Sequence, residues 1–83
     1  MLNVSVISPE AVLYEGETDS VVAPAHDGEV GILTGHAPMM ALLGKGVLRL
    51  GSGGSGRKFN VEGGFLQVVA NTVRVVTEKA SAA

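Results

Sequence analysis

Two histidines and one carboxylate are the side chains of this sequence best suited to acid–base chemistry or to metal binding. His26 and Asp27 are adjacent, and His36 follows further along the chain. Two imidazoles and a carboxylate form a donor set that zinc accepts, but their spacing fits no established ligand motif. We therefore interpret both histidines as solvated turn residues and predict no metal site. A small metal- or ligand-binding domain built on these three residues is kept as a competing hypothesis.

The sequence shows no residue pattern typical of nucleophilic catalysis. The chain has no cysteine, which excludes a cysteine nucleophile, a thiolate zinc site and a disulfide framework. Ser8, Ser52 and Ser55 lie in expected loops, and no serine stands in the Gly-x-Ser-x-Gly pattern of a hydrolase nucleophile. The sequence therefore gives no positive support for an enzyme.

A glycine-rich run at residues 51–56 satisfies the dinucleotide-binding pattern G-x-G-x-x-G through Gly51, Gly53 and Gly56. That pattern binds a pyrophosphate because a helix begins directly after the glycines. Here the following residues, 57–61, alternate like a strand, and Arg57-Lys58 stands where a phosphate-binding loop needs Lys-Ser or Lys-Thr. We interpret the run as a flexible hairpin loop.

Size and composition predict one small folded domain that covers residues 1–83. Hydrophobic residues make up 46% of the chain and charged residues 17%, which excludes a disordered charged tail. Aromatic residues are scarce, so the core must come from Val, Leu, Ile and Ala. No apolar run is long enough for a membrane-spanning helix, and no export leader stands at Met1, so we expect a soluble chain.

Charges are distributed unevenly along the chain. All 6 basic residues follow position 44, whereas most of the 8 acidic residues precede it. In a folded sheet protein, neutralising cross-strand pairs are the favoured interpretation. The alternative is an acidic patch near Asp27 and Glu29 that faces a basic partner. Nucleic acid is not expected as that partner, because the basic residues do not cluster with aromatic ones.

Short alternating segments separated by Gly, Pro and Asn predict an all-β fold without a helix of ordinary length. The expected strands span residues 2–7, 12–14, 20–23, 29–33, 39–43, 47–50, 58–61, 65–70 and 73–77. Expected turns include residues 62–64 and 71–72, and the tail at residues 78–83 is expected to fray. Many short Val-rich strands are typical of an antiparallel sandwich or barrel.

The stretch at residues 28–40 combines turn signals with an apolar run. Asp27-Gly28 predicts a hairpin, and the Gly-His-Ala-Pro sequence at residues 35–38 predicts a shaped turn, because proline cannot occupy a central strand. Residues 39–43 are apolar at consecutive positions. If they form a strand, the outward side chains either make an exposed patch for a protein partner or are buried at a sandwich corner.

Several separate segments resemble the amino-terminal domain of the epsilon subunit of F-type ATP synthases. They are residues 2–10, 21–24, 28–33, 35–38, 43–49, 61–66 and 71–73. The glycines, the His-Ala-Pro turn and the Gly-Gly-Phe step occur in this order over essentially the whole chain. The resemblance implies an all-β, antiparallel β-sandwich of about ten short strands in two sheets.

The resemblance implies a non-catalytic central-stalk (rotor) subunit that links gamma to the c-ring and couples proton transport to ATP synthesis. It implies no cofactor, no nucleic acid, no membrane insertion and no functional homo-oligomer. The implied location is a peripheral membrane complex on the cytoplasmic face of the bacterial inner membrane, with the chloroplast thylakoid stromal face as the alternative. A stand-alone β-sandwich protein-binding module is the alternative function.

The resemblance also implies a contact surface for the c-ring and gamma. The implied interface residues are Glu29, Val30, Gly31, Gly35, His36, Ala37, Pro38, Met39 and Met40. Glu29 is expected to meet basic c-ring residues in a charge-assisted bond, while the turn around His36 shapes the contact. Members of the family usually continue into a carboxy-terminal helical hairpin. Because this chain stops at Ala83, we expect no such helical domain in it, and neither hairpin-based inhibition nor ATP binding.

Overall fold

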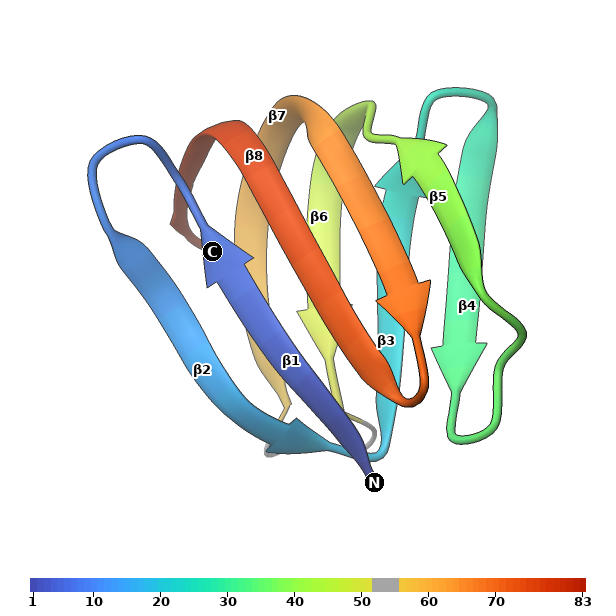
Figure 1. Cartoon of the computed structure of the whole chain (residues 1–83). Helices are drawn as coiled ribbons and strands as arrows, with labels where there is room; N and C mark the ends of the chain where they lie inside the picture. The colour runs from blue at the N-terminus through green and yellow to red at the C-terminus, as the bar shows by residue number, and fades with distance from the viewer. Residues whose placement is uncertain (52–55) are drawn as a thin grey trace.

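A computed structural model describes residues 1–51 and 56–83, which form eight strands and no helix (Figure 1). The strands are β1 Leu2–Ile7, β2 Val12–Thr18, β3 Ser20–Ala25, β4 Gly28–Leu33, β5 Met39–Leu42, β6 Lys45–Leu50, β7 Arg57–Val69 and β8 Thr72–Ala82. The described residues contain no helix that is long and apolar enough to cross a membrane. The predicted all-β class is confirmed.

One continuous hydrogen-bonded sheet folds over itself to make both layers of the sandwich. Its strand order is β2-β1-β8-β7-β6-β3-β4, and β5 pairs with β7 off this path. The strand pairs are antiparallel except for β1 and β8, which run parallel. The expected pair of antiparallel sheets is therefore corrected to a single mixed sheet.

Two long strands, β7 and β8, connect the layers because each runs through both of them. Residues 57–62 of β7 pair with β6, whereas residues 65–68 pair with β5. β8 stays paired with β7 along both parts, and both strands curve over the same end of the molecule (Figure 1). The expected count of about ten strands is wrong for this reason. The predicted turn at residues 62–64 is a bend inside β7, and the tail expected to fray at residues 78–83 continues β8 as far as Ala82.

Two glycines make the bend in β7 possible. Gly63 and Gly64 have φ angles of +73° and +103°, a region that residues with a Cβ rarely adopt. A Cβ added at Gly64 would also collide with the carbonyl oxygen of Val76 on β8. The two backbones therefore approach more closely here than any side chain permits.

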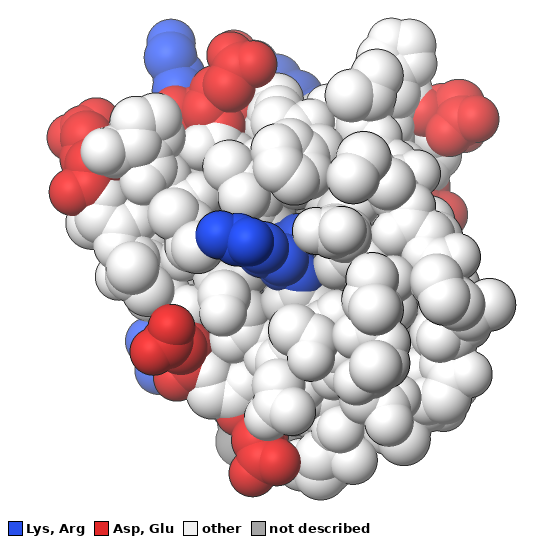
Figure 2. Space-filling view, viewed as in Figure 1, with Lys and Arg blue, Asp and Glu red and all other residues white. Residues whose placement is uncertain are grey.

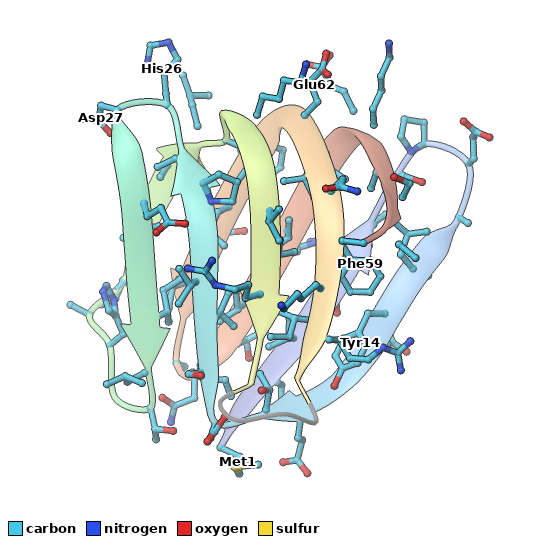
Figure 3. All side chains as sticks on the ribbon, turned by 180° about the vertical axis from the view of Figure 1, so that it is seen from behind. Met1, Tyr14, His26, Asp27, Phe59 and Glu62 are labelled. Carbon is cyan, nitrogen blue, oxygen red and sulfur yellow. The ribbon has the colours of Figure 1, made fainter. Side chains whose placement is uncertain are left out.

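The core lies between the two layers and is almost entirely aliphatic. Its buried residues are Leu2, Val4, Val6, Val21, Ala23, Ile32, Leu43, Leu48, Leu50, Phe59, Val61, Leu66, Val68, Val73 and Val75. At the β2 edge, the rings of Tyr14 and Phe59 meet edge to face with their centroids 6.4 Å apart (Figure 3). This aromatic contact joins the two layers on the side where β2 ends the sheet.

Most strands are longer than the sequence pattern indicates, β2 and β3 among them. β2 continues to Thr18, and β3 continues through Pro24 to Ala25. Pro24 is tolerated because β3 pairs with β6 only at Val21 and Val22, and the Pro24 carbonyl on that side accepts instead from the Gly44 N–H at 2.7 Å. The β3–β4 hairpin forms where Asp27-Gly28 predicts it, with Ala25 paired to Gly28.

We expect Gly64→Ala to lower the free energy of unfolding by about 3 kcal/mol or more, because the φ angle and the collision with β8 both oppose a side chain. Gly31→Ala is the matched control, since an added Cβ on this β4 residue meets nothing within 4 Å. Its effect should stay below about 1 kcal/mol. Urea unfolding of both variants measures the difference, and equal midpoints would contradict the role given to Gly64.

Candidate functional site

The residues predicted for the contact surface line one edge of the sandwich. β4 ends one layer, β5 pairs with β7, and the chain passes between them through residues 34–38 (Figure 1). Glu29 and Gly31 on β4 are exposed, as are Ala37 and Pro38 in the connection. The edge therefore forms one continuous band from β4 through the turn to β5.

Glu29 and the His36 turn lie at opposite ends of β4. Glu29 comes directly after the β3–β4 turn, whereas His36 follows Leu33 at the other end of the strand. At a rise of about 3.3 Å per residue, Glu29 and Leu33 are about 13 Å apart along the strand. A partner that contacts both Glu29 and His36 must therefore extend along the whole of β4.

Glu29 has an ionic partner within the chain that the sequence analysis did not identify. Arg49 Nη2 on β6 reaches across β3 and lies 3.3 Å from Glu29 Oε2 and 3.4 Å from Oε1. The side chains of Arg49 and Glu29 are 44% and 58% exposed, so solvent screens the pair and it contributes at most about 1 kcal/mol. A second cross-strand pair joins Lys45 to Glu62 at 4.0 Å. Cross-strand neutralisation between the two halves of the chain, the favoured interpretation of the charge distribution, is confirmed for Arg49 and Glu29.

A hydrogen bond between distant parts of the chain fixes the turn before β5. The Gly35 N–H donates to Asn71 Oδ1 at 2.7 Å, although the two residues are 36 positions apart. Asn71 lies in the β7–β8 turn at a φ angle of +63°, which asparagine tolerates better than most residues. The sequence predicts the turn at residues 35–38 but gives no signal for this brace.

The His36 ring is held by its own turn. Its Nδ1 lies 2.7 Å from the Ala37 carbonyl oxygen. Because a carbonyl oxygen only accepts, Nδ1 carries the proton and donates. The His36 backbone N–H donates to the Leu33 carbonyl at 3.1 Å. The ring nitrogen Nε2 is then the His36 atom left for water or a partner.

His26, Asp27 and His36 do not come together. His26 and Asp27 form the β3–β4 turn and extend from one end of the molecule (Figure 3), whereas His36 follows the other end of β4. Within residues 1–51 and 56–83, no group of three or more His, Asp or Glu side chains is placed to hold a metal ion. The structure therefore offers no site for the hypothesis built on these three residues.

The glycine-rich run lies mostly beyond the described residues. Residues 52–55 are outside them, so the hairpin loop expected at residues 51–56 falls outside what the structure describes. After Gly56 the chain enters strand β7 at Arg57. A dinucleotide site needs a helix at this position, and a strand occupies it.

β5 exposes alternate side chains. Met39 packs against the core, whereas Met40 and Leu42 are 66% and 67% exposed. These exposures show that nothing in the described part of the chain covers the outward side chains of β5. Of the two alternatives for residues 39–43, the structure shows the exposed apolar patch.

The outward side chains of β5 continue into a row of apolar side chains across the same layer. The register places Leu42 beside Phe65, Phe65 beside Val76, Val76 beside Ile7, and Ile7 beside Val12. We call these five residues the apolar row. Figure 2 shows the surface over these strands as largely uncharged, with acidic side chains around its margin. A surface of this kind on a small domain is suited to a protein partner.

The sequence of residues 1–83 matches the family described as the β-sandwich domain of the ATP synthase delta/epsilon chain. The chain belongs to this family. This confirms the resemblance drawn from the sequence. The ATP synthase epsilon chain of Leptospira borgpetersenii is 53% identical over 77 residues, and that of Synechococcus sp. is 39% identical over 79 residues. The two matches cover 93% and 95% of this chain but only 61% and 58% of the relatives. This chain therefore spans about three fifths of the length of those relatives.

Two solved structures contain the same sandwich fold. A chain in the Euglena gracilis mitochondrial ATP synthase structure (OSCP/F1/c-ring) superposes with a TM-score of 0.88 at 23% identity, over 98% of this chain and 52% of that one. A chain in the Tetrahymena thermophila mitochondrial ATP synthase structure (central stalk/c-ring) gives 0.78 at 19% identity, over 98% and 66%. At these identities the likeness shows the fold alone.

We expect Asn71→Gly to speed amide hydrogen exchange at Gly35 about fivefold, because the turn loses a hydrogen bond worth about 1 kcal/mol. Glycine keeps the positive φ angle available, so the effect isolates the lost acceptor. Asn71→Asp retains an acceptor oxygen and should exchange like the parent chain. Unchanged exchange in Asn71→Gly would show that Asn71 does not brace the turn.

Proposed function

We propose that this chain is the sandwich domain of a central-stalk epsilon subunit of an F-type ATP synthase. In this role it links gamma to the c-ring as a non-catalytic rotor component and couples proton transport to ATP synthesis. The observation that carries the proposal is the match of residues 1–83 to the delta/epsilon β-sandwich family. The named relatives are bacterial epsilon chains, which favours a peripheral complex on the cytoplasmic face of the bacterial inner membrane.

The geometry of the site supports a mechanical role. Transmission of torque needs a joint that does not yield. At one end of the contact edge, the Gly35 turn is braced by a hydrogen bond to Asn71 on the β7–β8 turn. At the other end, the exposed Arg49 pair orients Glu29 without fixing it. These contacts orient groups for docking and provide no pair of groups for proton transfer or nucleophilic attack.

Glu29 is the residue that we assign to the c-ring. A basic c-ring side chain would replace Arg49 as its partner in a charge-assisted bond. The exchange costs little, because the existing pair is exposed and screened by solvent. The other residues of the proposed contact surface, which runs along the same edge towards gamma, are Val30, Gly31, Gly35, His36, Ala37, Pro38, Met39 and Met40.

Titration of the folded chain with its cognate gamma subunit tests this function directly. We expect a one-to-one complex with a Kd of about 1 μM or below, which then assembles onto the c-ring. Isothermal calorimetry and size-exclusion chromatography measure the two steps. A folded sample that does not bind gamma at about 10 μM would contradict the rotor function and favour the stand-alone binding module.

We expect Glu29→Arg to weaken the c-ring step at least about tenfold and to leave gamma binding unchanged, because it places like charges opposite each other. Arg49→Gln releases the Glu29 carboxylate, so c-ring assembly should be retained or strengthened by about two- to fivefold. Glu10→Arg, in the β1–β2 connection, is the control for the charge change. Equal losses in Glu10→Arg and Glu29→Arg would remove Glu29 from the c-ring contact.

A further inference from the structure

The connection between β4 and β5, residues 34–38, gains little order from packing. We call this segment the contact turn, because most of it belongs to the proposed contact surface. All of its residues are exposed except the half-buried His36. The His36 N–H donates to the Leu33 carbonyl, and Gly35 has a φ angle of +86°, as the third residue of a type II turn requires. An exposed turn with so few buried contacts needs a further contact to hold it in one conformation.

That further contact comes from the β7–β8 turn. The Gly35 N–H donates to Asn71 Oδ1 at 2.7 Å, and among the described residues no other hydrogen bond joins the contact turn to a distant segment. The backbone of Asn71 is itself fixed, because its carbonyl accepts from the Asn3 N–H at 2.8 Å. Figure 1 shows the β7–β8 turn and the contact turn at the same end of the molecule. Asn71 therefore presents its side-chain oxygen to the contact turn from a firmly held part of the sheet.

The β7–β8 turn does not contain the residues that best suit its shape. Ala70 and Asn71 have φ angles of +49° and +63°, and a two-residue hairpin turn with two positive φ angles is of type I′. Asn-Gly is strongly preferred in such a turn, because alanine rarely adopts this conformation and glycine adopts it freely. A glycine at position 71 would relieve the turn, but it would remove the acceptor of the Gly35 hydrogen bond. The chain thus keeps an acceptor where turn geometry favours glycine, and retained backbone strain of this kind clusters at functional sites.

We propose that Asn71 is a positioning residue for docking onto the c-ring, and that it acts by holding the contact turn in its docking conformation before the partner arrives. Ordering a loose segment on binding costs free energy, and a turn that is already ordered avoids this cost. The inference rests on the function proposed above. It adds a residue from the β7–β8 turn, outside the contact edge, to those that determine c-ring docking.

A variant that improves the β7–β8 turn while it removes the acceptor tests the inference. The double variant Ala70→Asn/Asn71→Gly creates the preferred Asn-Gly turn, so its thermal unfolding midpoint should equal or exceed that of the parent chain. Docking of its complex with gamma onto the c-ring should nevertheless weaken about fivefold, because the contact turn loses its brace. Gamma binding should stay unchanged. A merely structural role of Asn71 would instead lower the unfolding midpoint and c-ring docking together.

Two matched variants keep the acceptor. Ala70→Asn retains Asn71 and should dock like the parent chain, and Asn71→Asp should dock at least as tightly, because a carboxylate oxygen also accepts from Gly35 N–H. Parent-like docking of the double variant, or an equal loss in its gamma binding, overturns the inference and leaves the proposed function standing. Failure of the parent chain to bind gamma and the c-ring overturns the proposed function, and the inference falls with it. Calorimetric titration and thermal unfolding measure all four chains.

Discussion

The close approach of β7 to β8 at Gly64 is the contact on which the rest of this structure depends. Because no side chain stands there, both long strands bend together, and one sheet covers both sides of its own core. The bend also divides β7 into one half that pairs with β6 and another that pairs with β5. This division decides which strands, and therefore which side chains, form each of the two outer faces.

The bent sheet separates two kinds of surface. The layer containing β6, β3 and β4 carries charged residues that are paired across strands, Arg49 with Glu29 among them. The layer containing β5, β8 and β1 carries the apolar row and, beside it, the exposed Arg74. Chemically different faces suit a small domain to hold two partners at once, as the proposed link between gamma and the c-ring requires.

Much of the fold was predictable because strand alternation is local. The period of two in residues 2–7 indicates which side chains point inward, and Asp27-Gly28 marks the β3–β4 hairpin correctly. The predicted turn at residues 62–64 and the predicted frayed tail at residues 78–83 are instead parts of β7 and β8. Glycine in a β pattern signals either a turn or a bend, and only the pairing of β7 with β8 decides between them. The assignment of residues 28–40 to a contact surface came from the family resemblance. Nothing in the sequence signalled that Arg49 pairs with Glu29, that Asn71 braces the Gly35 turn or that Phe65 lies beside Leu42.

By itself, the sequence determined the all-β class, the aliphatic core, the turn around His36 and the family, because composition, alternation and turn chemistry are local properties. The tertiary structure alone decided which side chains share a surface. Register joins Leu42 to Phe65 and Arg74 to Gln67, and folding brings Asn71 to Gly35. These neighbours are far apart in the chain, and a register shift of one residue would send each side chain to the opposite face. No local pattern carries that information.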